Sequence, residues 1–188
     1  MSIVKDTPER YGLVSRWLHW GIALLLLWQF AGMGLKLLLG RSPIVGLFVG
    51  SHASIGTLLL ALILLRILWA LAQRRHRPRH DRGLLGMAVR ACHLALYALM
   101  LVVPALAVLR MAGGQRPIRL FGVALRDAVQ GEVGWMTAPA DLLHGLLAWV
   151  FLALIAGHVA MVLVHQLVWR DGTLLRMAGR SARARRRP

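Results

Sequence analysis

The sequence predicts an all-α membrane protein, a bundle of four transmembrane helices. Of its 188 residues, 58% are hydrophobic and only 16% are charged, whereas soluble domains are about 45–50% apolar and about 25% charged. Four long runs lack Asp, Glu, Lys and Arg, and the segments between these runs are hydrophilic. A soluble domain of this size cannot bury so much apolar surface, so an ordinary soluble enzyme is excluded.

Each uncharged run is long enough to cross a bilayer. A hydrocarbon core about 30 Å thick needs roughly 20 helical residues, each of which adds about 1.5 Å. We therefore expect a single domain over residues 1–188 that ends in a basic tail at 170–188. The uncharged runs are 17–35, 42–65, 91–109 and 142–169. The expected spans are about 12–38, 43–72, 87–110 and 140–168.

Three of the spans carry a start signal in the sequence. Thr7-Pro8, Ser42-Pro43 and Thr137-Ala138-Pro139 each place a capping residue beside a proline that suits a first helical turn. The first run is longer than the apolar region of a cleavable signal peptide, and no convincing cleavage site follows it. The connection at 110–141 is long for a helix bundle, so we expect it to have structure of its own.

The basic residues indicate how the helices are oriented. Alternate hydrophilic segments face the same side, which gives 16 Lys and Arg on one side and 6 on the other, with Arg66 at the membrane edge. The positive-inside rule then places both termini in the cytoplasm. The formal net charge of +16 thus reflects topology and contact with lipid headgroups rather than nucleic-acid binding. Trp17, Trp20, Trp69 and Trp169 fall near the expected inner interface, where aromatic belts form.

Six of the eight histidines lie in or at the ends of the expected spans, where ionisable side chains are costly and rare. His144 and His158 are separated by nearly four helical turns, so they project from one face about 21 Å apart along the axis. Because neighbouring helices run in opposite directions, His52 falls at the level of His144 and His19 at the level of His158. We therefore predict two histidine pairs at two depths of the membrane.

Two histidines that face each other across a bundle suit an iron porphyrin, because each neutral imidazole supplies one axial nitrogen. A zinc ion would require further ligands, commonly carboxylate or thiolate, and no uncharged run contains Asp or Glu. The lone Cys92 excludes an internal disulfide, a CxxC pair and covalent haem attachment. The expected cofactors are two haems, held by His52 with His144 and by His19 with His158. The alternative for any single histidine is a hydrogen bond to a neighbouring helix.

Three further residues have more than one possible role. His165 could replace His158 as the partner of His19, although this would widen the separation of the two levels to about 31 Å. His93 could bond a haem propionate, help to form a quinone pocket, or simply pack between helices. Arg66 could pair with a propionate or extend to the lipid headgroups.

These residues resemble the bacterial cytochrome b561 family, which is grouped with the cytochrome b subunits of nickel hydrogenases. The resemblance covers essentially the whole chain. It implies four helices, two b-type haems with ligands on the first, second and fourth spans, and electron exchange with the quinone pool. The matching residues are Leu18-His19-Trp20, His52 with Gly56, His93 with Tyr97, Leu143-His144 with His158, and the run Trp169-Arg170-Asp171-Gly172-Thr173-Leu174-Leu175-Arg176-Met177.

Within this family, the length and the tail motif look closest to the superoxide oxidases, which pass electrons from periplasmic superoxide to ubiquinone in the bacterial inner membrane. The outer segments carry six basic residues against three acidic ones, which would favour an anionic donor. One departure is His165-Gln166, where the family often has two adjacent histidines.

Two other functions fit the sequence. One is a cytochrome b subunit that relays electrons for a partner enzyme such as a hydrogenase or a soluble cytochrome, and the other is a haem-free transporter or scaffold. The expected partners are membrane lipid, quinone and a small periplasmic electron donor, without nucleic acid. The sequence carries no signal for the oligomeric state.

Overall fold

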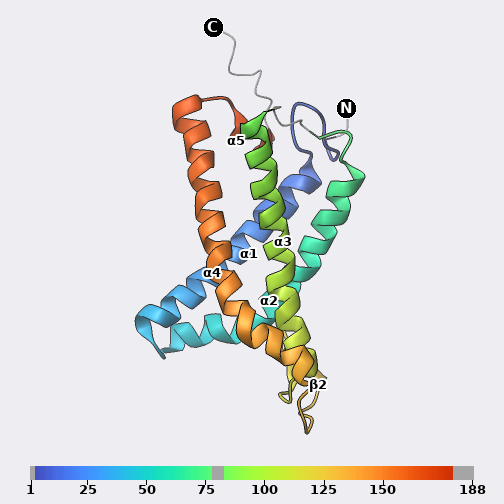
Figure 1. The fold of residues 1–188 in the computed structure, drawn as a ribbon, viewed down its shortest axis with the longest axis vertical. Helices are drawn as coiled ribbons and strands as arrows, with labels where there is room; N and C mark the ends of the chain where they lie inside the picture. Colours follow the sequence, from blue (N-terminus) through green and yellow to red (C-terminus); the bar gives the residue numbers. More distant parts are fainter. Residues whose placement is uncertain (1–2, 78–82, 180–188) are drawn as a thin grey trace. The chain divides into compact units, whose positions relative to one another are not determined.

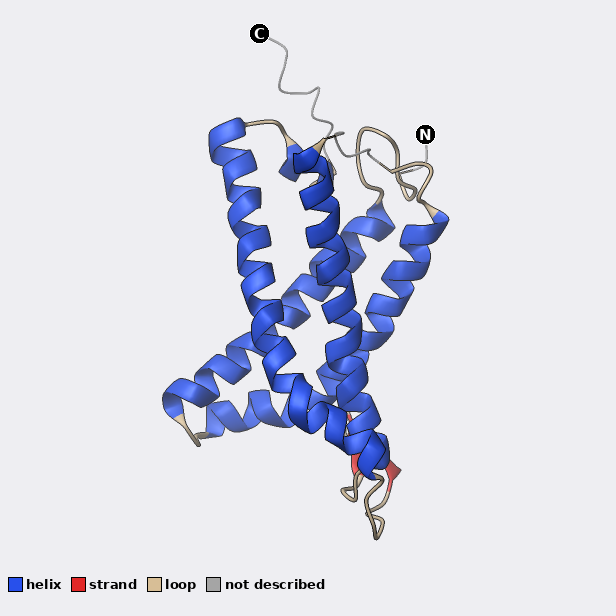
Figure 2. Cartoon of the chain, in the orientation of Figure 1, coloured by secondary structure: helices blue, strands red, loops and turns tan. Residues whose placement is uncertain are grey.

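Four long helices dominate the computed structural model, which describes residues 3–77 and 83–179. Each of the four is long and apolar enough to cross a membrane, so the predicted fold class is confirmed. Arg79, His80, Arg82 and the end of the expected basic tail lie outside the described residues. The elements (Figures 1 and 2) are α1 (Leu13–Leu39), α2 (Pro43–Ala72), α3 (Leu84–Gly113), β1 (Ile118–Leu120), β2 (Val123–Arg126), α4 (Gly134–Val164), the π-helical turn η1 (His165–Trp169) and α5 (Thr173–Met177).

The chain forms two compact units, and each unit contains part of every long helix. The first unit comprises the described parts of 1–21, 64–97 and 153–188, and the second comprises 22–63 and 98–152. His52 and His144 belong to the second unit, and the other four histidines of the expected spans belong to the first. The long helices keep large apolar side chains on their outer surfaces, including Leu24, Leu68, Leu94 and Leu146, as expected where lipid is the solvent.

The helix starts differ from two of the three predictions. Ser42 caps α2 as expected, because its Oγ accepts a hydrogen bond from the backbone N–H of Val45 at 3.4 Å. Thr7-Pro8 was expected to start a helix but does not, since Thr7 closes a separate turn with Arg10 and α1 begins only at Leu13. Pro139 lies inside α4 rather than in its first turn, because the helix already begins at Gly134.

The long connection after α3 contains a β-hairpin, which confirms the expectation of local structure there. Strands β1 and β2 pair antiparallel, and the two residues between them, Phe121 and Gly122, both have positive φ, at 52° and 83°. Positive φ at both central residues is typical of the two-residue turns that match strand twist. The N–H of Phe121 donates to Ser54 Oγ of α2 at 2.9 Å. The guanidinium of Arg126 donates to carbonyls at the C-terminal end of α3.

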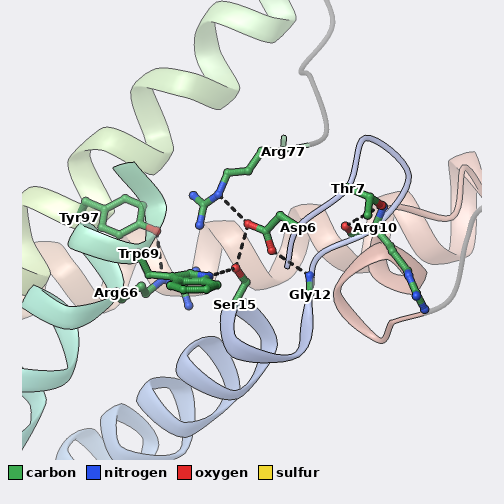
Figure 3. A network of polar contacts seen from close by, with 9 residues as sticks. All are labelled: Asp6, Thr7, Arg10, Gly12, Ser15, Arg66, Trp69, Arg77 and Tyr97. Carbon is green, nitrogen blue, oxygen red and sulfur yellow. Dashed lines mark hydrogen bonds and ion pairs between the residues drawn. The ribbon is translucent and has the colours of Figure 1, made fainter. Parts of the chain in front are cut away.

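A buried carboxylate organises the N-terminal segment of the first unit (Figure 3). Asp6 is only 3% exposed and accepts hydrogen bonds from Gly12 N–H at 2.8 Å and Ser15 Oγ at 2.9 Å. The Nε of Arg77 lies 3.0 Å from the same carboxylate, and Trp69 Nε1 donates to Ser15 Oγ at 3.0 Å. We call these five residues the Asp6 network. It ties the segment before α1 to the end of α2.

Candidate functional site

His52 of α2 and His144 of α4 face each other within the second unit. Their ring centroids are 6.2 Å apart, and the ring planes are inclined by 78°. Two bonds of about 2 Å between a metal and imidazole nitrogens, together with the half-widths of the rings, place two axial imidazoles roughly 6 Å apart. The spacing of this histidine pair therefore fits one metal ion between the rings.

Hydrogen bonding leaves both rings free to bind a metal. His144 Nδ1 lies 3.0 Å from the carbonyl oxygen of Val103, and because a carbonyl only accepts, Nδ1 carries the proton. The lone pair of His144 therefore lies on Nε2, as in histidines that ligate metals. His52 Nδ1 is buried and has no hydrogen-bond partner among the described residues, so no described protein group holds that nitrogen.

Gln29 of α1 supports the His52 side of the pair. Its Nε2 donates to the backbone carbonyl of His52 at 3.0 Å, and a Cβ atom at Gly56 would lie 3.3 Å from the same nitrogen. Gly56 thus leaves room for the amide that holds the α2 backbone at His52. Sequence reasoning missed Gln29, although it is the only amide side chain in the first uncharged run, and a polar residue at membrane depth is itself a signal.

The first unit contains a second group of histidines, one from each of three helices. His158 of α4 and His93 of α3 have ring centroids 5.5 Å apart with planes at 82°. His93 Nδ1 lies 2.7 Å from the carbonyl of Val89 in its own helix. His19 of α1 lies close enough to His158, His93 and Arg66 to interact with them electrostatically. We call His19, His93 and His158 the three-histidine cluster.

The three-histidine cluster contains the pair that the sequence predicted and adds a neighbour. His19 and His158 lie in it together, and His93 approaches His158 closely. Helix directions place residues at a depth but do not give the rotation of α3 against α4, so the closeness of His93 to His158 was not predictable. The Nδ1–H of His93 donates to the carbonyl of Val89 in its own helix, which fixes the tautomer of this ring.

His165 lies in η1 and has different partners. Its Nδ1 is hydrogen-bonded to Asp171 Oδ2, and its ring packs edge-on against Trp169 with centroids 4.5 Å apart. Partial burial acts to raise the pKa of Asp171, but hydrogen bonds from Thr173 and His165 outweigh it and hold that pKa below the ordinary value of 3.8. The structure thus joins His165 to an ionised carboxylate at the end of the fourth span.

Arg66 lies in the same unit as the three-histidine cluster. Its Nε donates to the hydroxyl of Tyr97 at 3.0 Å (Figure 3). Its Nη1 is buried and has no hydrogen-bond partner among the described residues. This orphaned donor fits a binding site for an anionic group.

These side chains suit a porphyrin better than a bare ion. In the described part of the chain, no three His, Cys, Asp or Glu side chains are gathered so as to hold a metal by themselves. A porphyrin supplies its own equatorial nitrogens and needs only one or two axial ligands from the protein. The histidine pair has the ring spacing for two such ligands, and the three-histidine cluster contains the candidates for a second set.

Comparison with known proteins assigns the whole chain to one kind of protein. Residues 10–180 match the family described as prokaryotic cytochrome b561. The chain is also similar to cytochrome b561 homolog 2 of Escherichia coli (strain K12), with 32% identity over 179 residues. That alignment covers 94% of this chain and 95% of the relative.

Proposed function

The chain belongs to the prokaryotic cytochrome b561 family and is a multi-pass membrane b-type cytochrome for electron transfer, and from this premise we propose that it moves electrons between a periplasmic donor and the ubiquinone pool. We place it in the bacterial inner membrane with both termini in the cytoplasm. The donor that we propose is superoxide. The charge distribution and the family membership support these assignments.

The observation that carries the proposal is the histidine pair. His52 and His144 have the ring spacing of two axial ligands, and Val103 fixes the tautomer of His144 that leaves Nε2 free. We propose that this pair holds one haem b and that His19 and His158 hold a second. When bound, such haems would supply one-electron transfer.

An anionic donor is supported by the charges of the second unit. Lys36, Arg41, Arg116 and Arg119 are exposed there, opposed by exposed Asp127 and Glu132. Arg110 is paired with Asp141, and Arg126 is occupied with the carbonyls at the end of α3. The exposed surplus is therefore positive, which raises the local concentration of a small anion.

For the quinone we propose the first unit, which contains His93 and His165. Two superoxide ions each lose one electron and become dioxygen, while the quinone gains those two electrons and two protons and becomes quinol. His165 is bonded to Asp171, whose side chain is 39% exposed, so this pair can pass a proton from water to a bound quinone. His93, which lies beside His158, is the second residue that we assign to the quinone site.

The test uses the purified full-length chain without any partner protein. We expect a reduced b-type haem spectrum, a redox titration that resolves two haems, and reduction of a soluble ubiquinone analogue when superoxide is generated. Superoxide dismutase should abolish the quinol signal. A colourless protein made with ample haem would exclude the cytochrome proposal. A haem protein that reduces quinone only when a partner enzyme is added would instead be a relay or anchor subunit.

A further inference from the structure

We propose that Arg66 anchors a propionate carboxylate of the haem held at the three-histidine cluster, with Tyr97 as its positioning residue. The inference rests on the proposed function, because it requires a haem at that cluster. It goes further than the proposed function because it assigns a carboxylate-binding role to Arg66, which is not one of the proposed iron ligands.

Tyr97 orients the guanidinium of Arg66. The Nε of Arg66 donates to the Tyr97 hydroxyl at 3.0 Å, and its Cζ lies 5.7 Å from the centre of the Tyr97 ring (Figure 3). These two contacts fix one edge of the planar guanidinium. The remaining donors include Nη1, which is buried without a hydrogen-bond partner. A fixed guanidinium with unused donors is suited to a carboxylate.

The charge of Arg66 has no counter-ion in the described part of the chain. The ion pairs there are Arg77 with Asp6, Arg110 with Asp141, and His165 with Asp171. Within the first unit the described carboxylates are Asp6 and Asp171, which are both paired, and Glu9, which is exposed. A partly buried charge in a membrane span is costly without a partner. An anion from outside the chain would remove this cost.

The position of Arg66 identifies the anion. Arg66 lies six residues before the end of α2 at Ala72, about 9 Å along the helix axis, and in the same compact unit as His19 and His158. A haem held by these histidines would carry two propionate carboxylates, and these are the anions that we assign to Arg66. An arginine that extends to lipid headgroups keeps its nitrogens in contact with water or phosphate, whereas Nη1 of Arg66 is buried and its Nε donates to Tyr97.

Haem with esterified propionates tests the proposal, because the ester keeps the ring and removes the carboxylate charge. Full-length apoprotein is titrated with haem b and, separately, with its dimethyl ester. Hydrogen bonds between charged groups are strong. We therefore expect one of the two haem sites of the wild-type chain to bind haem b at least about tenfold more tightly than it binds the ester. Arg66→Met should lose that preference, and Arg66→Lys should keep part of it.

The control is Arg90→Met, which removes an exposed arginine of α3 in the same unit and should behave like wild type. A redox titration of the holoprotein is the second readout, in which Arg66→Met should lower the potential of one haem because a nearby positive charge favours the reduced form. If Arg66→Met does not fold, Tyr97→Phe replaces it, and its preference for haem b over the ester should fall several-fold.

The outcomes separate the two proposals. A folded Arg66→Met protein that still prefers haem b to the ester as strongly as wild type overturns the role of Arg66 and leaves the cytochrome function intact. The same result is expected if the true partner of Arg66 is a lipid phosphate. Failure of the wild-type chain to bind haem at all overturns the proposed function itself.

Discussion

A single backbone carbonyl fixes the tautomer of His144 that can bind a metal through Nε2. Val103 O can only accept a hydrogen bond, so it holds the proton of His144 on Nδ1 and leaves the lone pair on Nε2. His52 has no such partner on its buried Nδ1. The protein therefore fixes the tautomer of His144, whereas the tautomer of His52 would be set by the metal that it binds.

Replacement of His144 should abolish binding of one haem and leave binding of the other unchanged. In His144→Ala the pair loses one of its two nitrogens, while the three-histidine cluster belongs to the other unit and is untouched. We expect the haem content to fall from two per chain to about one, measured by pyridine haemochrome assay. His76→Ala, which changes an exposed histidine after α2, is the control. Two retained haems in His144→Ala would show that the pair is not an axial ligand set.

Alanine variants of the three-histidine cluster distinguish the proposed haem ligands, His19 and His158, from the neighbouring His93. We expect His19→Ala and His158→Ala each to lose the second haem, because each removes an axial nitrogen. His93→Ala should keep both haems and change only the potential of one or the rate of quinone reduction, since His93 lies beside His158. Haem content and redox titration distinguish these results. Loss of haem from His93→Ala with retention in His19→Ala would make His93 the ligand.

At the scale of elements, the Asp6 network is what ties the N-terminal segment to the helices. Asp6→Ala removes hydrogen bonds from Gly12 and Ser15 and the ion pair with Arg77. We expect a loss of about 1–3 kcal/mol, because buried donors are left unpaired. The readouts are a lower Tm in detergent and faster proteolysis before α1. Glu9→Ala, at an exposed position, should change neither, and a wild-type Tm in Asp6→Ala would contradict the role.

The turn after α4 should be sensitive to acid. The pKa of Asp171 lies below 3.8 in the folded chain, so its hydrogen bonds stabilise the turn at higher pH and are lost as pH falls through that lowered pKa. We expect the amide of Thr173, which donates to Asp171 Oδ1 at 2.9 Å, to lose protection from hydrogen exchange only as the pH falls below the ordinary carboxyl pKa of 3.8. In Asp171→Asn the protection should be weak at every pH. An unchanged wild-type profile down to pH 2 would refute this link.

The elements themselves were largely predictable, since uncharged runs of helical length lead directly to four spans. The predicted helix starts were wrong where contacts with other segments of the chain override the local sequence signal. Thr7-Pro8 has the sequence of a helix start, yet Asp6 and Arg77 hold this segment in another conformation. The hairpin was expected only as unspecified structure, because its attachment to Ser54 joins positions far apart in the sequence.

At the scale of the whole molecule, the grouping of the histidines was predictable and the rotation of the helices was not. Helix direction and residue spacing group His52 with His144 and His19 with His158, and the structure places each group in one unit. Spacing along one helix carries no information on how far a neighbouring helix is turned about its own axis. The contacts of His93 with His158 and of Arg66 with Tyr97 depend on that rotation, so only three-dimensional packing reveals them.

We expect the topology to follow from the distribution of Lys and Arg, and cysteine labelling in a variant that lacks Cys92 tests it. The side with more Lys and Arg should face the cytoplasm, so the segment with Arg74 should be inside and the segment with Arg116 outside. In a Cys92→Ser background, Arg116→Cys should react with a membrane-impermeant maleimide in intact spheroplasts, and Arg74→Cys only after permeabilisation. Both positions are exposed, so reactivity reports the side of the membrane rather than burial. The reverse labelling would place both termini and the three-histidine cluster towards the periplasm, and the proposed direction from periplasmic donor to quinone would have to be abandoned.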